Sequence, residues 1–495
     1  MNKHYKVLAV SMLAAAIGGC AVTSQPIERA VSEQRAQEDL TSMFSGQEPL
    51  NAPLTLHQAM ARAVKYNLEA RLKVMEEALA ERQVDLSRLD MLPRMALDAG
   101  YAGRNNVSAS SSRSISTGTQ SLEPSTSQDR DREVGDLTMV WNVLDFGVSY
   151  VSAQQQGDQR LIVQERRRKV LHTIIQDVRS AYWRALAAER LLVQIDQQMA
   201  RVDQARQNSL RMSEQRIGDP VQSLGYQRAL IEATRQLEQQ RRALSLAKTE
   251  LAALINLPMN TRFELAPASD SYPVPTLATD MVVLEQEALI NRPELREQDY
   301  QARIGAAETR KAMLRMLPGL EFSLGGHYDS NSFLTNQSWA DYGVKVTWNL
   351  FNLLSAPAAI DAAKASEDVV TLRRQAMSMA ILAQLYVANA NFQEAARQFS
   401  TSEQLASLDQ QIAEQLRNRH KAQGIGELEL IQGELNLLQA NLRRDLAYAD
   451  LRNAYGQVFA SVGLDPLPEE LGSDQLDDIA QALASREAEW QAGKL

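Results

Sequence analysis

Met91-Leu92-Pro93 ends one predicted helix of this chain, and Met316-Leu317-Pro318 ends another. An alternating pattern of apolar and polar residues follows each tripeptide. It runs to a Trp-Asn pair, Trp141-Asn142 in the first case and Trp348-Asn349 in the second. A long helical pattern follows each pair. A repeat of this length predicts two copies of one structural unit, which we expect to lie side by side in one assembly.

Length and composition indicate one elongated, mainly helical body. The chain has 495 residues, a net charge of −9 and 5% aromatic residues, and it is rich in Ala, Leu, Gln, Glu and Arg. This composition is typical of long helices and coiled coils. The negative charge and the lack of a basic stripe disfavour a nucleic-acid partner. No apolar run after the N-terminus has the length of a transmembrane helix, so a membrane role would come from strands or lipid.

The N-terminus has the pattern of a secretory signal peptide over residues 1–19. Lysines precede a short apolar stretch, which ends in small residues before Cys20, the single cysteine of the sequence. The segment Ile17-Gly18-Gly19-Cys20 resembles a bacterial lipobox, in which the cysteine becomes the lipidated first residue. The resemblance implies a palmitate-type lipid anchor, and Ala21 then favours delivery to the outer membrane. The alternative is an ordinary signal peptide that ends near a cysteine.

The rest of the chain divides into two repeat units with polar segments around them. Residues 20–53 contain three prolines and predict a lipid-anchored tether. The first unit covers 54–257, and the second covers 281–463. The linker 258–280 contains four prolines and is expected at the waist of the body. The tail 464–495 is expected to contain a short acidic helix of low importance to the core.

Each unit is expected to begin with a helix. In the first unit a helical pattern starts near Leu54, with Thr55 as its candidate N-cap. Pro93 ends this helix, because proline has no amide proton and clashes with the preceding turn.

Four segments of about ten residues alternate between apolar and polar side chains, at about 94–104, 133–144, 319–330 and 339–351. The first two are joined by a Ser-rich segment, 108–127, which predicts a flexible loop. The alternation fits transmembrane barrel strands with lipid outside and water inside. A soluble antiparallel sheet with one wet face is the alternative. Five charged residues on the polar face are candidates to line the lumen: Asp98, Asp136, Glu321, Asp341 and Lys345.

A long helical hairpin follows each strand pair, at 147–257 and at 357–462. The first hairpin is expected to have arms at 147–212 and 220–257. Leucines at every seventh position of the return arm predict coiled-coil packing: Leu230, Leu237, Leu244 and Leu251. The longer arm has about 65 residues and would span roughly 95 Å, which no compact domain requires.

The sequence lacks the residue patterns of an enzyme, a metal site or a cofactor site. Its five histidines are not at metal-ligand spacing: His4, His57, His172, His327 and His420. No zinc motif and no Gly-rich phosphate loop is present. His327 falls on the polar strand face, where it either lines a lumen or is simply solvated. We therefore expect no catalytic activity and no cofactor.

Four transmembrane strands cannot form a closed barrel, and open strand edges are not tolerated in lipid. The smallest outer-membrane barrels have eight strands. The chain is therefore expected to oligomerise. A trimer would have about twelve strands in one barrel, and the long helices would continue it as a barrel of coiled coils. The two repeat units would make this trimer quasi-sixfold.

The lipobox, the duplicated strand and helix hairpins, the Leu-Pro entries and the Trp-Asn exits together resemble the TolC-like outer-membrane efflux family, lipoprotein type. The resemblance covers roughly residues 54–462. It implies a mainly α fold with a β-barrel part, four strands per protomer, and a homotrimeric duct in the cell outer membrane that extends into the periplasm. It also implies a periplasmic adaptor and an inner-membrane pump as partners.

Three functions remain open. The first is an outer-membrane duct for efflux, as in resistance-nodulation-division systems. The second is the same duct serving type I protein or polysaccharide secretion. The third is a lipid-anchored periplasmic coiled-coil scaffold or adaptor without a barrel. Duplicated hairpins and four alternating strands disfavour the third function.

The tips of the helical hairpins are candidate docking sites for the adaptor. Arg216 and Gly218 mark the first tip, and Lys421 and Gly424 mark the second. Glycines suit tight turns that need a positive φ, so the alternative is that these segments are only turns.

The family resemblance also implies an acidic ring near the tips that narrows the pore. Glu427 and Glu429 follow the second tip, and Glu429 stands at the position of one family acid. Gln432 stands where a second acid often lies, which predicts a weaker ring. Asp219 at the first tip is a further candidate for this gate. The alternative is that these acids only favour a helix N-terminus through its dipole.

Overall fold

The structure of this protein is a computed structural model that describes residues 26–215, 219–266, 272–468 and 472–494. The chain forms two units, residues 1–49 and residues 50–495. The first unit contains helix α2 (Arg29–Ser42), which has no buried residue. The predicted signal peptide and the lipidation site Cys20 lie outside the described residues. All further elements belong to the second unit.

The helix expected before Pro93 is in fact two helices, α3 (Leu56–Tyr66) and α4 (Leu68–Leu89). Thr55 is the N-cap of α3, as predicted, and forms a capping box with Gln58. The expectation of a continuous helix is wrong at Asn67. The backbone leaves the helical region there, with ψ at 128°, and the Asn67 side chain accepts hydrogen bonds from the amides of Glu69 and Ala70. Asn67 therefore starts a new helix.

The second repeat has the same division. Helix α8 (Met281–Asn291) ends at Arg292, and α9 (Pro293–Leu314) begins at the next residue. Proline suits the first position of a helix, because its missing N–H would have no partner there. Both repeats therefore enter their strands from a long helix that follows a short one.

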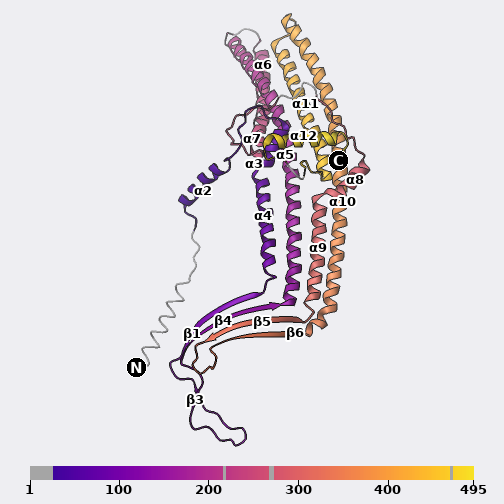
Figure 1. Cartoon of the computed structure of the whole chain (residues 1–495). Coiled ribbons are helices and arrows are strands. Elements are labelled where there is room, and N and C mark those ends of the chain that lie inside the picture. Colours follow the sequence, from indigo (N-terminus) through magenta and orange to yellow (C-terminus); the bar gives the residue numbers. More distant parts are fainter. Residues whose placement is uncertain (1–25, 216–218, 267–271, 469–471, 495) are drawn as a thin grey trace. The chain divides into compact units, whose positions relative to one another are not determined.

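Four long strands form one antiparallel sheet, drawn at one end of the second unit in Figure 1. The order along the sheet is β1 (Arg94–Gly103), β4 (Asp131–Asn142), β5 (Gly319–Asp329) and β6 (Ser338–Thr347). Strands β1 and β6 are its two edges. The Ser-rich segment is not only a loop, since it contains a small sheet of β2 (Ala109–Ser110) and β3 (Ser125–Thr126).

The strands end and the long helices begin earlier than expected. Helix α5 (Val143–Glu214) starts directly after β4, and α10 (Phe351–Lys421) starts four residues after β6. The predicted strand 339–351 is therefore too long at its C-terminal end. The reason is the asparagine of each Trp-Asn pair, whose side chain accepts a hydrogen bond from an amide of the following helix.

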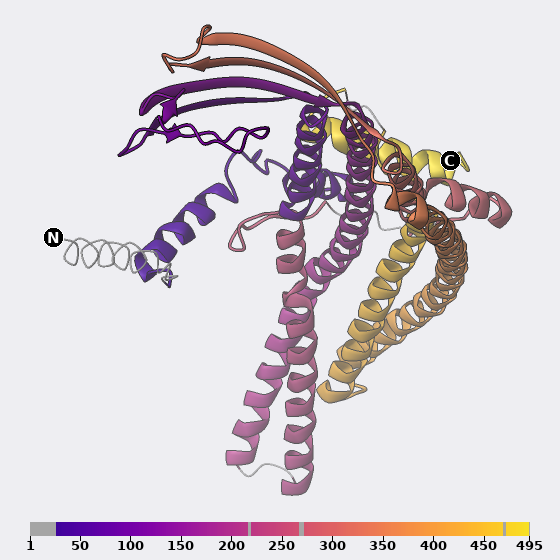
Figure 2. The ribbon, with the colours of Figure 1, turned by 90° about the horizontal axis from the view of Figure 1, so that it is seen from below.

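The waist is the middle of the second unit, where α3, α7 (Ala247–Leu254), α8 and the C-terminal helix pack on the long helices. Two helical hairpins extend from it away from the sheet (Figure 2). Helix α5 has 72 residues, a length of about 108 Å at 1.5 Å per residue. Helix α10 has 71 residues, and α11 (Glu427–Val462) returns along it as a continuous helix. The return arm of the first hairpin was expected to be continuous but divides into α6 (Pro220–Ser245) and α7. The division lies at Leu246, where the amide bonds the Leu244 carbonyl instead of continuing the helical pattern.

The core lies at the waist, where the short helices pack on the long ones. One cluster joins α3, α5, α7 and the tip-side part of α11, and it includes the predicted heptad leucines. The C-terminal helix α12 (Leu476–Gln491) packs on α3, and the expectation that it has low importance is wrong. Its apolar stripe is buried: Leu476, Ile479, Leu483 and Trp490.

Candidate functional site

The four-stranded sheet has one apolar face that is open to its surroundings. Register pairs Met95 with Met139 and Phe322 with Val344, so these side chains share that face. The exposed fraction reaches 89% at Tyr342. Further exposed members are Leu97, Tyr101, Leu137, Leu324 and Val346. An apolar surface of this extent marks contact with a membrane or another protein.

The other face of the sheet carries all five charged residues that the sequence assigns to a lumen. Asp98 lies directly opposite Asp136, and Glu321 lies opposite Lys345. Asp341 is opposite Gly325, two residues from His327, and shares the same face. The structure therefore brings the predicted residues to one surface. That this surface lines a channel remains a prediction.

A cluster around His327 on the same face was missed by the sequence reasoning. Its Nδ1 lies 2.5 Å from Oδ1 of Asp136, and its Nε2 lies 3.1 Å from Oδ2 of Asp341. Trp339 stacks on the imidazole, with 5.1 Å between ring centres. The sequence does contain a signal for part of this cluster, because the strand alternation places Trp339 on the same face as Asp341.

The junction between strands and helices explains why the two motifs repeat. The side chain of Asn142 accepts hydrogen bonds from the amides of Leu144 and Asp145, at 2.9 and 3.3 Å. Asn349 accepts one from the amide of Phe351 at 3.1 Å. Each Trp-Asn pair therefore starts a long helix at the end of a strand.

The described part of the first hairpin tip is the start of α6, and the second tip is a tight turn. Asp219 caps α6 by accepting a hydrogen bond from the Val221 amide at 2.8 Å. In the second tip the left-handed residue is Gln423, with φ of 57°, and not Gly424 as expected. The amide of Gly424 closes the turn on the Arg419 carbonyl. Lys421 is the last residue of α10. Arg216 and Gly218 lie outside the described residues.

The proposed gate acids lie in the first turns of α11. Glu429 and Gln432 are exposed, and Glu427 is half-buried. Burial, and then the nearby Glu427 carboxylate, raise the pKa of Tyr226 on α6, so the two hairpins approach each other here. A single chain supplies one copy of each acid, and the existence of a ring remains a prediction.

A buried acid further along α11 joins the two hairpins and was not found from the sequence. Glu434 is only 4% exposed. Its carboxylate contacts Arg201 of α5 and lies 3.0 Å from Nε of Arg417 on α10. The amide of Gln198 adds a hydrogen bond of 3.0 Å. Glu434 is therefore the charged link between the first hairpin and the second.

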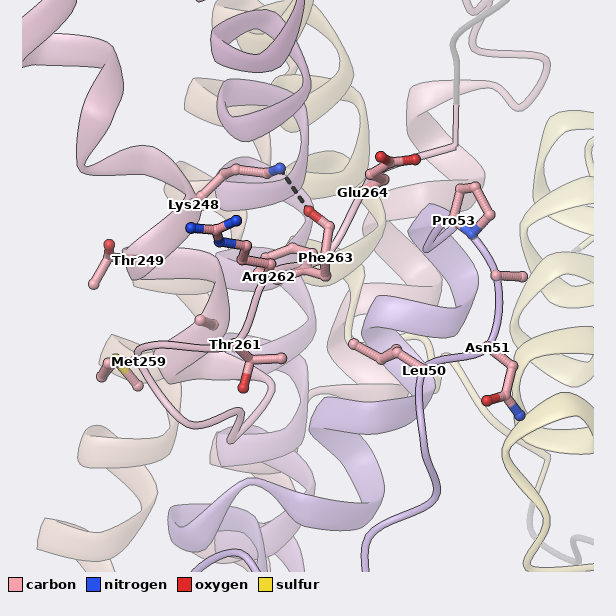
Figure 3. Close-up of a pocket in the computed structure, with 12 residues that line it drawn as sticks. Leu50, Asn51, Pro53, Lys248, Thr249, Met259, Thr261, Arg262, Phe263 and Glu264 are labelled. Atoms are coloured by element: carbon pink, nitrogen blue, oxygen red, sulfur yellow. Dashed lines mark hydrogen bonds between the residues drawn. The ribbon is translucent and has the colours of Figure 1, made fainter.

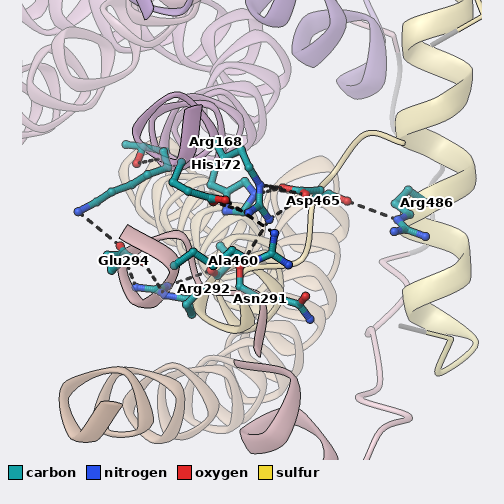
Figure 4. Close-up of polar contacts among 12 residues, drawn as sticks. Arg168, His172, Asn291, Arg292, Glu294, Ala460, Asp465 and Arg486 are labelled. Carbon is teal, nitrogen blue, oxygen red and sulfur yellow. Dashed lines mark hydrogen bonds and ion pairs between the residues drawn. The ribbon is translucent and has the colours of Figure 1, made fainter. Parts of the chain in front are cut away.

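A polar network fixes the waist between α5 and the segment after α11 (Figure 4). Arg168 donates from Nε to both oxygens of Asp465 at 3.1 Å, and His172 lies 3.0 Å from the same carboxylate. Burial alone would raise the pKa of Asp465, but the hydrogen bonds and charges of His172 and Arg168 outweigh it and hold this pKa below its usual range. Arg292 donates to the Ala460 carbonyl at 3.1 Å and so joins the start of α9 to the end of α11.

A second buried acid ties α12 to the waist. Glu487 contacts His57 of α3 at 3.2 Å, Arg452 of α11 at 2.9 Å and Arg179 of α5 at 3.6 Å. Its burial would raise the pKa, but the His57 hydrogen bond and the two arginine charges lower it to about 2. The Glu487 carboxylate therefore joins α12 to three other helices, α3, α5 and α11.

An open pocket of about 640 Å³ lies beside the waist (Figure 3). Residues 50–53, α7 and residues 259–264 line it. Lys248 in its wall donates to the Phe263 carbonyl at 2.7 Å and pairs with Glu189 at 2.7 Å. Its charge is therefore already balanced, and we assign no ligand to this pocket.

Among the described residues, no group of three or more His, Cys, Asp or Glu side chains could hold a metal ion. Within the same part of the chain, no helix is both long and apolar enough to cross a membrane.

An antiparallel sheet with one apolar face, joined to two long helical hairpins, is the fold of outer-membrane channel proteins of the TolC type. The chain matches the CmeC outer membrane channel of Campylobacter jejuni with a TM-score of 0.66 and 13% identity, over 89% of this chain and 94% of that one. It matches the open state of the MtrE outer membrane channel of Neisseria gonorrhoeae at 0.62 and 19%, over 81% and 88%. The outer membrane protein VceC of Vibrio cholerae matches at 0.60 and 13%, over 82% and 96%.

These comparisons confirm the predicted TolC-like fold. No family model matches the sequence. No curated protein matches it either. The likeness is therefore one of structure, at identities where the fold persists and residue-level function does not transfer.

Proposed function

We propose that this protein is the outer-membrane channel of a tripartite efflux system. Three copies would form a duct that carries substrates across the outer membrane from a periplasmic adaptor and an inner-membrane pump. One observation carries the proposal: a four-stranded sheet with an open apolar face, a charged opposite face and two unpaired edges continues into helices of more than 70 residues.

The unpaired edges support a closed oligomer. In lipid every backbone amide and carbonyl needs a partner, so β1 and β6 must pair with strands of other copies. The strands alternate in direction across the sheet, so β6 of one copy can pair with β1 of the next in the same antiparallel pattern. Three copies give about twelve strands, above the minimum of eight for outer-membrane barrels.

The helical hairpins support a periplasmic duct that reaches toward partners. A helix of about 108 Å extends far beyond the thickness of a bilayer, which is about 30 Å in its hydrocarbon core. The tips formed by Asp219 and by Lys421 to Gly424 would meet the adaptor, and Glu429 of three copies would narrow the pore.

Two measurements on the purified full-length protein test the channel function. The first is migration on a gel as a heat-modifiable trimer, and the second is conductance in planar lipid bilayers. We expect both. A monomer without conductance would exclude the barrel. The inner-membrane protein that co-purifies after cross-linking would separate an efflux pump from a secretion transporter.

Lipidation at Cys20 is a separate part of the proposal. Several acyl chains together give stable anchoring, while a single chain binds only reversibly. We expect labelled palmitate to enter the wild-type protein and not Cys20→Ser. Equal labelling of the two proteins would assign the segment to an ordinary signal peptide.

A further inference from the structure

His327 occupies a central place on the charged face of the sheet. It lies on β5 between Asp136 of β4 and Asp341 of β6, at 2.5 and 3.1 Å from its two ring nitrogens. Asp98 of β1 lies directly opposite Asp136 in the register. We call these four side chains, one from each strand of the sheet, the level of His327. Three strands supply an aspartate to it, and β5 supplies the histidine.

Gly325 leaves room for the contact between His327 and Asp341. A Cβ atom on Gly325 would lie 2.5 Å from Nε2 of His327 and 2.6 Å from Oδ1 of Asp341, so a larger residue would displace these two side chains from their present contact. Trp339 covers one face of the imidazole, with ring planes inclined by 20°. The imidazole is therefore held between two carboxylates and one indole ring, with 17% of its side chain exposed.

The geometry favours the charged form of His327. An ionised carboxylate only accepts hydrogen bonds, and a neutral imidazole has only one N–H. A neutral ring would therefore direct a lone pair at one of the two carboxylates. The Nε2 contact is an ion pair rather than a well-directed hydrogen bond, so it depends on the charge of the ring.

The other charges on this face are balanced or lie at different levels. Arg132 of β4 pairs with Asp329 of β5 at 2.7 Å. Lys345 of β6 faces Glu321 of β5 across the sheet. The level of His327 therefore has a formal charge of −2 per chain when the imidazole is protonated and −3 when it is neutral.

We propose that His327 sets the ion selectivity of the channel by controlling the charge of this level with pH. The inference rests on the proposed channel function, in which this face lines the pore. Histidine is the side chain whose ordinary charge change falls between about pH 5 and pH 8, so measurements at pH 5 and pH 8.5 compare its charged and neutral forms. Loss of its proton also frees Asp136 and Asp341 to face the pore, where carboxylates attract inorganic or organic cations.

The test is the reversal potential of the purified full-length protein in planar bilayers under a KCl gradient, at pH 5 and pH 8.5. In the wild type we expect the ratio of cation to anion permeability to rise by about 1.5-fold at the higher pH, which is the ratio of −3 to −2. His327→Gln should lose this rise, because glutamine does not titrate. His420→Gln, which removes the histidine of the second hairpin tip, should keep it.

A second variant, at Asp136, tests the same cluster in case His327→Gln does not fold. Asp136→Asn keeps the histidine but removes one carboxylate, and it should lower the cation preference at both pH values. A pH-dependent rise that persists in His327→Gln, or a wild type without one, would overturn the inference while leaving the channel in place. Absence of conductance in every protein would instead overturn the proposed channel function.

Discussion

The indole N–H of Trp348 donates a hydrogen bond of 3.0 Å to the main-chain carbonyl of Met316. This bond joins the second Trp-Asn pair to the second Met-Leu-Pro segment, which lie at the two ends of the β5–β6 hairpin. The side chain of Asn352 strengthens the same junction by donating to the Arg315 carbonyl at 3.0 Å. The two repeated motifs therefore meet in space where helices pass into strands.

Trp348→Phe should destabilise this junction. The ring remains, but the Met316 carbonyl loses its donor, and a hydrogen bond of this kind contributes about 1 kcal/mol to stability. We expect a lower thermal unfolding midpoint in detergent, followed by circular dichroism. Trp141→Phe is the matched control from the first repeat, because the Trp141 indole N–H has no hydrogen-bond partner among the described residues. Equal losses in the two variants would contradict the role of the bond.

Gly456→Ala should be strongly destabilising. A Cβ atom at this position would lie 1.5 Å from Nη1 of Arg179, whose side chain is buried and paired with Glu487. Arg179 would have to leave that contact, and overpacking of this kind costs about 1–3 kcal/mol. The measurement is the free energy of unfolding from urea titration.

Gly225→Ala provides the opposite control for that substitution. Gly225 is exposed in α6, and an added Cβ would meet nothing within 4 Å. Alanine is favoured over glycine within a helix by about 1 kcal/mol, so this variant should be slightly more stable than the wild type. A similar loss in both variants would mean that helix geometry, and not Arg179, limits position 456.

Glu487 should give the waist a defined dependence on pH. Its pKa is about 2 in the folded chain and 4.5 in its ordinary state, so the carboxylate stabilises the fold fully only at pH values well above 4.5. This contribution decreases as the pH falls from about 5 to 2, and its full size is roughly 3 kcal/mol. Glu487→Gln should be less stable than the wild type at pH 7, and the difference should shrink as the pH approaches 2.

The control for this effect is Glu489→Gln, two residues away on the same helix. Glu489 is exposed, and within the described residues its ion pair is with its helix neighbour Arg486 at 3.1 Å. Exposed pairs contribute little, so this variant should follow the wild-type curve at every pH. A difference between wild type and Glu487→Gln that stays constant with pH would refute the assignment.

Glu434→Gln should loosen the two hairpins from each other. The substitution removes the charge that holds Arg201 and Arg417, and a glutamine in the same buried place satisfies them poorly. We expect faster amide hydrogen exchange in the tip half of α11, with a local loss of about 1–3 kcal/mol. Glu414→Gln, at an exposed position of α10, should leave exchange unchanged.

Glu429→Gln tests the acidic ring at the tip. Three copies of this exposed acid around a narrow axis would attract cations, so the neutral variant should shift the reversal potential toward lower cation selectivity. The shift should be present at both acidic and basic pH, unlike the effect expected for His327. An unchanged reversal potential would leave Glu429 with a role at the helix N-terminus only.

The strands and long helices could be predicted because their signals are local and repeated. Period-two alternation gave the correct faces of all four strands, and heptad leucines gave a hairpin arm. The helix break at Asn67 depends on a side chain that caps a new helix, which sequence spacing alone does not distinguish from a continuous helix. The break at Leu246 has no glycine or proline to mark it.

The two buried acids, Glu434 and Glu487, could not be predicted from the sequence for a different reason. Glu434 and Glu487 look like ordinary solvated residues of polar helices, and their arginine partners lie in other helices. Only the assembled waist shows that these acids are buried. The helical spacing of Leu476, Ile479 and Leu483, in contrast, is a local signal in the sequence that α12 packs on the core.

The contact between α3 and α12 has a consequence for the order of assembly. His57 and Glu487 are 430 residues apart in the chain, yet they form one contact. In a chain made from the N-terminus to the C-terminus, α3 is complete long before α12, so the surface of α3 that α12 covers stays exposed until then. Contacts of such long sequence separation form late, because closing the loop costs entropy. The α3–α12 contact therefore completes the fold late, and a chain that stops before α12 would keep an apolar surface of α3 exposed.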